Sequence, residues 1–157
     1  MIIVLFEPEI PWNTGNIGRT CVATGTSLHL VGKLGFKISD KEIRRSGLDY
    51  WSHLKLCLHE SFEAFEATLA PNASVLVFSI QGRSLFWKAP YREDSYLVFG
   101  NESSGLPLEI RRRYQESLYR VPMGQEVRSL NLSTLVGIAL YEGLRQTKTP
   151  APFFTEL

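Results

Sequence analysis

Apolar positions along the chain follow two spacings, one typical of buried strands and one typical of amphipathic helices. An uninterrupted apolar run at Ile2–Phe6 predicts a strand buried on both faces, as in a parallel sheet, and 74–80 predicts another strong strand. Near the end of the chain, Leu132, Val136 and Leu140 recur at helical spacing, which predicts a helix with one face in the core. The same patterns predict further strands at 27–31, 54–58, 96–99 and 117–121, and further helices at 13–24, 40–45, 61–69 and 107–114.

Strands and helices therefore alternate along the chain. This order predicts an α/β fold with a mostly parallel sheet and helices on both faces. At 157 residues the chain suits one domain over 1–157, and only a proline-containing tail at about 148–157 looks irregular.

The amino-acid composition limits the kinds of molecule that the protein can be expected to bind. The net charge of +1, from 17 basic and 16 acidic residues, excludes a strongly basic nucleic-acid binder but leaves room for a local basic patch. No apolar run reaches the length of a membrane span or resembles a signal peptide, so we expect a cytoplasmic protein without a membrane partner.

Cys21 and Cys57 lie among apolar neighbours and are expected to be buried free thiols. His29, His53 and His59 are scattered without zinc spacing, so no metal is expected.

Three polar loops, each after a strand-like run and before a helix-like run, hold the candidate chemistry. They are 13–19, 97–107 and 121–133, and loops at the carboxyl ends of strands bind ligands in open α/β sheets. The phosphate-binding signatures rich in glycine are missing. Gly100 permits a close backbone approach, while Ser129 and Asn131 add polar side chains. Such a site suits a ligand with an adenine ring and a ribose, but composition does not name it.

The three loops resemble the three motifs of the SPOUT methyltransferases, in order and at the spacing of that family. The minimal length, the opening 6–11 segment and the 44–50 segment resemble its TrmL (YibK-like) group, which are tRNA (cytidine/uridine-34)-2'-O-methyltransferases. The matching motifs are Asn13-x-Gly15-Asn16-x-x-Arg19, Gly100-x-Glu102-x-x-Gly105-Leu106 and Ser129-Leu-Asn131-x-Ser133.

This resemblance implies S-adenosylmethionine as cofactor, S-adenosylhomocysteine as product, and a deep trefoil knot in the carboxyl-terminal part of the chain. It also implies a homodimer that acts on the wobble nucleotide of tRNA, with no metal. By resemblance, the cofactor walls are Phe78, Gly100, Val121, Met123, Ser129 and Leu130. The residues implied in catalysis are Arg19, Asn13, Glu102, Ser129 and Asn131, with Arg19 at the ribose 2'-hydroxyl.

Several of these residues also have a purely structural interpretation. Asn13 is a plausible helix cap, and Glu102 suits the start of a helix. Gly100 could serve only a turn, and Phe78 suits the core. Arg19 points away from the apolar side of its helix, where it could simply be solvated; because a guanidinium stays protonated, it is an awkward general base.

A basic and aromatic cluster is the candidate RNA surface, since phosphate contacts and base stacking need that combination. An ordinary solvated face is the alternative. Two other function classes also remain open: a non-catalytic cofactor or RNA-binding module, and an unrelated nucleotide-binding α/β enzyme. The cluster comprises Lys33, Lys37, Lys41, Arg44 and Arg45, followed by Tyr50 and Trp51.

Overall fold

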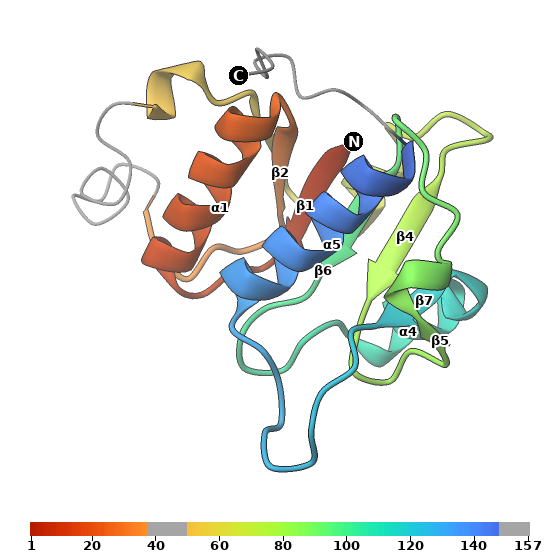
Figure 1. Ribbon diagram of the computed structural model, residues 1–157. Helices are drawn as coiled ribbons and strands as arrows, with labels where there is room; N and C mark the ends of the chain where they lie inside the picture. Colours follow the sequence, from red (N-terminus) through yellow and green to blue (C-terminus); the bar gives the residue numbers. More distant parts are fainter. Residues whose placement is uncertain (38–49, 148–157) are drawn as a thin grey trace, which may run out of the picture.

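The computed structural model describes residues 1–37 and 50–147, which form one open α/β sheet with helices on both faces (Figure 1). The described strands pair in parallel throughout, in the order β3-β2-β1-β6-β4-β7-β5, which confirms the predicted fold class. The strands are β1 Ile2–Phe6, β2 Ser27–Val31, β3 Leu56–His59, β4 Val75–Phe78, β5 Ser84–Leu85, β6 Tyr96–Phe99 and β7 Leu118–Arg120.

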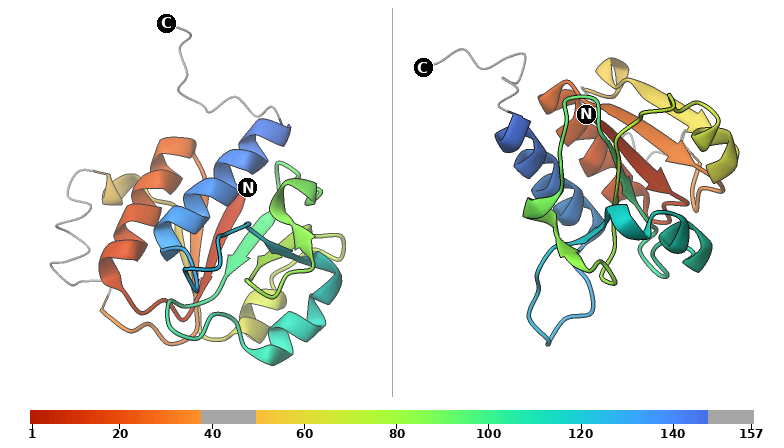
Figure 2. Two further views of the ribbon diagram at one scale, coloured as in Figure 1. Left: turned by 60° about the horizontal axis from the view of Figure 1, so that its bottom comes forward. Right: turned by 90° about the vertical axis from the view of Figure 1, so that its right-hand side faces the viewer.

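Helices cover the two faces of the sheet unequally. The long helices α1 (Pro11–Thr24) and α5 (Leu132–Thr147) lie side by side on one face, and α3 (Phe62–Glu66) and α4 (Leu108–Arg113) lie on the other (Figures 1 and 2). Short 3-10 turns at Trp51–His53, Phe86–Lys88 and Gln115–Ser117 complete the described elements. No helix within these ranges is long and apolar enough to span a membrane.

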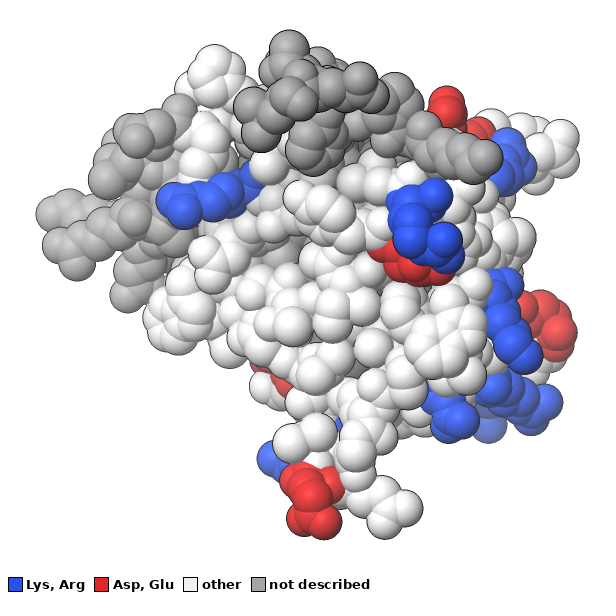
Figure 3. Space-filling model, viewed as in Figure 1, with Lys and Arg blue, Asp and Glu red and all other residues white. Residues whose placement is uncertain are grey.

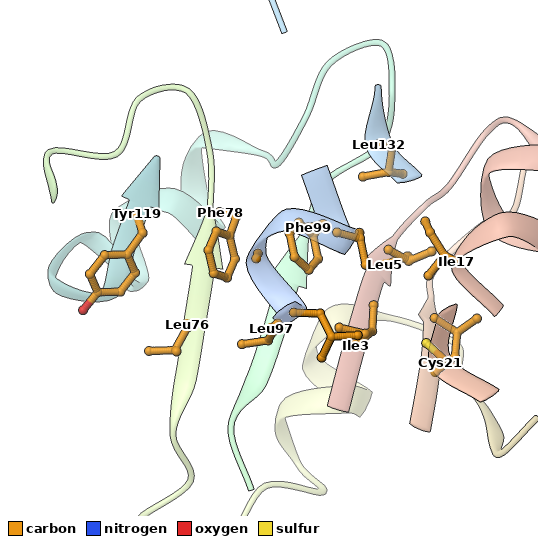
Figure 4. Close-up of a cluster of buried hydrophobic side chains, with 14 of the residues drawn as sticks. Ile3, Leu5, Ile17, Cys21, Leu76, Phe78, Leu97, Phe99, Tyr119 and Leu132 are labelled. Atoms are coloured by element: carbon orange, nitrogen blue, oxygen red, sulfur yellow. The ribbon is translucent and has the colours of Figure 1, made fainter. Parts of the chain in front are cut away.

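Strand alternation divides the core into two clusters. Ile3 and Leu5 point toward α1 and α5, where they pack with Ile17, Phe99 and their neighbours (Figure 4). Val4 points to the opposite face and packs in the cluster of α3 and α4. Both faces of β1 are therefore buried, which explains its continuous apolar run.

The boundaries of several elements differ from the prediction. Helix α1 begins at Pro11, with Ile10 as its N-cap, so the prediction that Asn13 caps this helix is wrong; its end at Gly25, with φ +66°, is confirmed. Proline is favoured at the first helical position because it has no N–H to leave unpaired. Strand β5 is only Ser84–Leu85, too short to produce a period in the sequence. The predicted helix 40–45 lies outside the described residues.

Two expectations about sulfur and imidazole groups are wrong. Cys21 is buried in the core as expected, but Cys57 is exposed because β3 is an edge strand. His29 and His59 are not scattered: they face each other on neighbouring strands, with His59 Nε2 3.0 Å from His29 Nδ1. Burial, together with His59, lowers the pKa of His29 to about 4.

The strand order is consistent with a threaded chain. β7, made late in the chain, lies between β4 and β5, which are joined to each other through 79–83. This connection passes close to β7, since a Cβ on Gly82 would lie 2.4 Å from the carbonyl carbon of Tyr119. The deep trefoil knot itself remains an implication of the resemblance.

Candidate active site

A cleft of about 650 Å³ opens at the carboxyl ends of the central strands. Its walls come from the start of α1, the loops after β4 and β6, and the segment that leads into α5. All three motif loops therefore meet at one site, as expected for ligand sites of parallel sheets. Of the expected site residues, those that line this cleft are Asn13, Phe78, Gly100, Glu102, Ser129, Leu130 and Asn131.

A chain of hydrogen bonds joins the three loops through their polar side chains. Asn13 Nδ2 donates to Glu102 Oε1 at 3.0 Å, and Asn131 Nδ2 donates to Asn13 Oδ1 at 3.0 Å. Asn13 is only 2% exposed, so these bonds are sheltered from water. The amide of Asn13 is suited to this place because it accepts on one side and donates on the other.

The Glu102 carboxylate also holds the start of α1. Besides the Asn13 amide, it accepts from the backbone N–H of Glu9 at 2.8 Å and that of Ile10 at 3.3 Å. These N–H groups lie just before the helix, where no intrahelical acceptor is available. With three donors on its two oxygens, Glu102 has the environment of a positioning residue rather than of a general base.

Asn131 ties the last helix to the same network. Its Oδ1 accepts from the backbone N–H of Ser133 at 2.9 Å and from the Ser133 hydroxyl at 2.7 Å. Because Asn131 directly precedes α5, its side chain caps that helix with the oxygen and reaches α1 with the nitrogen.

The loop after β6 closes on itself, which gives Gly100 a structural role in addition to its place in the lining of the cleft. Asn101 Oδ1 accepts from the N–H groups of Ser104 at 2.8 Å and Gly105 at 3.1 Å. A Cβ on Gly100 would lie 2.1 Å from the carbonyl carbon of Gly105. The glycine is therefore required by the loop's own backbone, because any side chain here would meet that backbone.

The expected cofactor walls divide between two neighbouring hollows. Phe78 is 3% exposed and stacks on Phe99 with ring centroids 4.8 Å apart, so it belongs to the core and also forms part of the cleft wall. Val121 and Met123 line a smaller hollow of about 240 Å³, which shares Ile80 with the cleft. Together the two hollows contain all six expected cofactor-contacting residues.

Arg19 does not line the cleft of its own chain. It lies on the exposed side of α1, and its guanidinium carbon is 5.1 Å from the ring centroid of Tyr50. The Tyr50 hydroxyl in turn donates to the carbonyl of Gly15 at 2.8 Å. The Tyr50 ring, bonded to α1, therefore supports the arginine in a defined place on the protein surface.

Several polar residues of the cleft were not predicted individually. Ser79 and Gln81 follow β4, and Arg128 brings a positive charge from the segment before α5. Arg128 directly precedes Ser129 of the third motif, so its position in the sequence was a signal by which it could have been predicted. Ser79 and Gln81 follow a strand without any motif, and only the folded sheet brings them to the site.

The predicted RNA surface is only partly covered by the described residues. Lys33 and Lys37 are both exposed after β2. Lys41, Arg44 and Arg45 lie outside the described residues.

Comparison with known proteins assigns the family. Residues 1–141 match the model of the SpoU rRNA methylase family. The chain belongs to this family. It is 45% identical over 145 residues to the tRNA (cytidine(34)-2'-O)-methyltransferase of Methylovorus glucosotrophus, a match that covers 92% of this chain and 94% of that one. The resemblance of the three motifs is thus confirmed at the level of the family.

Solved structures agree with this assignment. A structure described as giving insight into the 2'-OH methylation of C/U34 on tRNA is 48% identical, with a TM-score of 0.87 and coverage of 92% of this chain and 89% of that one. An AdoMet-bound rRNA methyltransferase from Sinorhizobium meliloti is 28% identical with a TM-score of 0.83; the match covers 92% of this chain and 56% of that one.

Proposed function

We propose that this chain transfers a methyl group from S-adenosylmethionine to the ribose 2'-oxygen of cytidine or uridine 34 in tRNA. The observation that supports this most is the meeting of all three motif loops in one cleft. The similarity to an enzyme named for cytidine 34, over nearly the full length of both chains, supports the choice of nucleotide.

The residues around the cleft fit this cofactor. Phe78, Leu130 and Leu135 provide apolar surface for an adenine ring, while Asn101 and Ser129 provide polar groups for a ribose and an amino-acid moiety. A volume of about 650 Å³ lies in the range of sites for small molecules. When bound, S-adenosylmethionine supplies a methyl group on a positively charged sulfur, already activated for transfer.

The chain's own polar residues hold the geometry of the reaction. Asn13, Glu102 and Asn131 fix the walls relative to one another, so that a 2'-oxygen can be held in line with the methyl group. Ser129 is exposed at the cleft, where its hydroxyl can orient the ribose. These groups position the reactants, and none of them needs to change its charge, because the proton of the 2'-hydroxyl passes to solvent water as the oxygen takes the methyl group and S-adenosylhomocysteine is left.

Arg19 serves the cleft of a second copy of the chain in this proposal. Its guanidinium lies outside its own cleft, and as a permanent cation it can anchor a phosphate or stabilise negative charge that develops on the 2'-oxygen. A site built from two chains would explain why a motif residue faces away from the other motif residues.

The homodimer that this requires has a suitable surface. Trp12 on α1 is 55% exposed, and Tyr141 on α5 is 52% exposed, with Ile138 one turn away. Figure 3 shows few charged side chains over the centre of the face that carries these two helices. Exposed apolar side chains on an uncharged face are typical of contacts between subunits.

The tRNA is proposed to contact the basic segment after β2. Lys33 and Lys37 are exposed there, and Lys41, Arg44 and Arg45 follow in the sequence. A loop nucleotide such as 34 is unpaired, so its sugar can enter the cleft without melting a stem. A tRNA substrate also implies a cytoplasmic location.

A methyl-transfer assay tests the proposal. The chain is incubated with labelled S-adenosylmethionine and individual tRNAs, and the modified nucleotide is mapped. We expect one methyl group on the ribose of nucleotide 34. A matched tRNA with a 2'-deoxy nucleotide 34 should accept none, because it lacks the attacking oxygen.

Two other results would contradict the proposal in different ways. Methylation of ribosomal RNA or of another tRNA position would indicate a different substrate for the same chemistry. Cofactor binding without transfer to any RNA would indicate a non-catalytic binding module.

A further inference from the structure

Two histidines and a cysteine lie together at the edge of the sheet, away from the cleft. His29 comes from β2, and Cys57 and His59 come from β3. Their nitrogen and sulfur ligand atoms all lie within 4.8 Å of one another. None of these residues lines the cleft, so the methyl-transfer chemistry gives them no task.

The pairing of the strands places the three side chains on one face. His29 is the direct neighbour of Cys57 in the parallel register, and His59 follows Cys57 by two residues. Because side chains alternate along a strand, Cys57 and His59 point to the same side, the side of α3. The sheet itself, rather than a flexible loop, therefore fixes the spacing of the group.

The two imidazoles are already close to the separation that a shared metal ion requires. His29 Nδ1 and His59 Nε2 are 3.0 Å apart. Two nitrogens bound at about 2.0–2.1 Å to a tetrahedral zinc ion lie about 3.3 Å apart. The rings would need to separate by only a few tenths of an ångström, and the Cys57 thiol would approach them by rotation about its side-chain bond.

The surroundings of the group combine an apolar floor with an open side. The ring of Phe65 lies edge-on to both imidazoles, with centroid distances of 6.3 Å to His29 and 5.5 Å to His59. Tyr96 packs against both His29 and Phe65, with ring centroids 6.2 Å and 5.6 Å away. Cys57 is exposed, so an ion can reach the thiol from solvent.

We propose that His29, Cys57 and His59 bind one zinc ion, with a water molecule as the fourth ligand. Two imidazoles and a thiolate form the nitrogen and sulfur set that zinc prefers, whereas magnesium and calcium prefer oxygen. On binding, the thiol proton leaves to solvent, and the hydrogen shared by the two rings moves to an outward ring nitrogen. The ion joins β2 to the edge strand β3 and stabilises that edge of the sheet.

Metal titration tests the site without reference to methyl transfer. The chain, free of any affinity tag and stripped with a chelator, is titrated with Zn²⁺ in competition with a chromophoric chelator, and separately with Co²⁺ under absorption spectroscopy. We expect one equivalent of either ion, a thiolate-to-cobalt charge-transfer band, and a rise in the thermal unfolding temperature with Zn²⁺.

Variants of the three ligand residues distinguish zinc binding at this site from nonspecific zinc binding elsewhere on the chain. Cys57→Ser should abolish the charge-transfer band while Cys21 remains, because that second thiol is buried in the core. His59→Gln should weaken zinc binding by more than about tenfold, since loss of even an outer partner of a ligand costs that much. His53→Gln, at a histidine on the surface turn Trp51–His53, is the matched control and should bind as the unmodified chain does.

Two outcomes would overturn the proposal. One is a cobalt complex without a thiolate band in the unmodified chain. The other is zinc affinity that is the same in Cys57→Ser, His59→Gln and the control. Because Cys57 is exposed, its substitution should leave the fold intact, and circular dichroism of the metal-free variants checks this.

Discussion

At the scale of single residues, the organisation of the site depends on a few polar side chains with several partners each. Glu102 accepts hydrogen bonds from the Glu9 and Ile10 backbone and from Asn13. A carboxylate held by three donors stabilises structure, and it has little capacity left to accept a proton from substrate. The sequence motif pointed to this residue and the structure places it in the lining of the cleft, but its structural role follows only from its partners.

Glu102→Gln is expected to lower the free energy of unfolding by about 1.5–3 kcal/mol, because the amide replaces one charged acceptor oxygen with a donor. Cofactor affinity should fall with it, since the start of α1 loosens beside the cleft. Urea denaturation and calorimetry with S-adenosylhomocysteine measure the two effects.

Glu116→Gln is the matched control, at an exposed carboxylate outside the cleft, and should change stability by less than about 0.5 kcal/mol. A different pattern would identify Glu102 as a general base: normal stability and normal cofactor binding in Glu102→Gln, with methyl transfer lost.

At the scale of elements, the loop after β6 is shaped by the absence of a side chain at Gly100. Gly100→Ala is expected to cost about 1–3 kcal/mol in the free energy of unfolding, because the new Cβ meets backbone that cannot move aside. Thermal or urea denaturation measures this cost. Gly124→Ala is the control, since a Cβ there meets nothing within 4 Å. If the two variants had equal free energies of unfolding, the loop after β6 would be able to move aside for the new Cβ without loss of stability.

The sequence predicted the elements whose signals are local. The apolar runs of β1 and β6 and the helical spacing in α5 gave the fold class, and Gly25 gave the end of α1. Features that arise from pairing distant segments were missed. Strand β5 exists because it pairs with β7.

The same distinction applies to the sites. The motif loops could be expected to meet because parallel strands end at one edge, and they do. The exposure of Cys57 and its closeness to His29 depend on β3 being the edge strand beside β2. The order of the strands in the sheet cannot be read from the spacing of residues along the chain.

At the scale of the whole molecule, the position of Arg19 predicts that activity requires two chains. The Arg19→Ala variant has an intact cleft but no arginine, and the Ser129→Trp variant has the arginine but a cleft filled by the tryptophan. The two variants are mixed under conditions in which subunits exchange between dimers. Each variant alone should be inactive. The mixture should recover methyl transfer, because a mixed dimer has one intact cleft facing one intact arginine.

Two controls accompany this mixing experiment. Co-purification of differently tagged chains verifies that mixed dimers form, and adding Tyr141→Glu to both chains should abolish recovery by placing charge on the proposed contact surface. Verified mixed dimers that stay inactive would mean that Arg19 acts on its own chain's cleft.

The hydrogen bonds that Asn13 donates to Glu102 and accepts from Asn131 also imply an order of events during synthesis of the protein. Residues 13 and 102 leave the ribosome before residue 131, and until then the cleft lacks one wall and the amide of Asn13 lacks one partner. A nascent chain can thus acquire most of its sheet without being able to retain the methyl donor. We therefore expect ligand affinity only after the last helix has docked, so that binding would report a completely folded polypeptide.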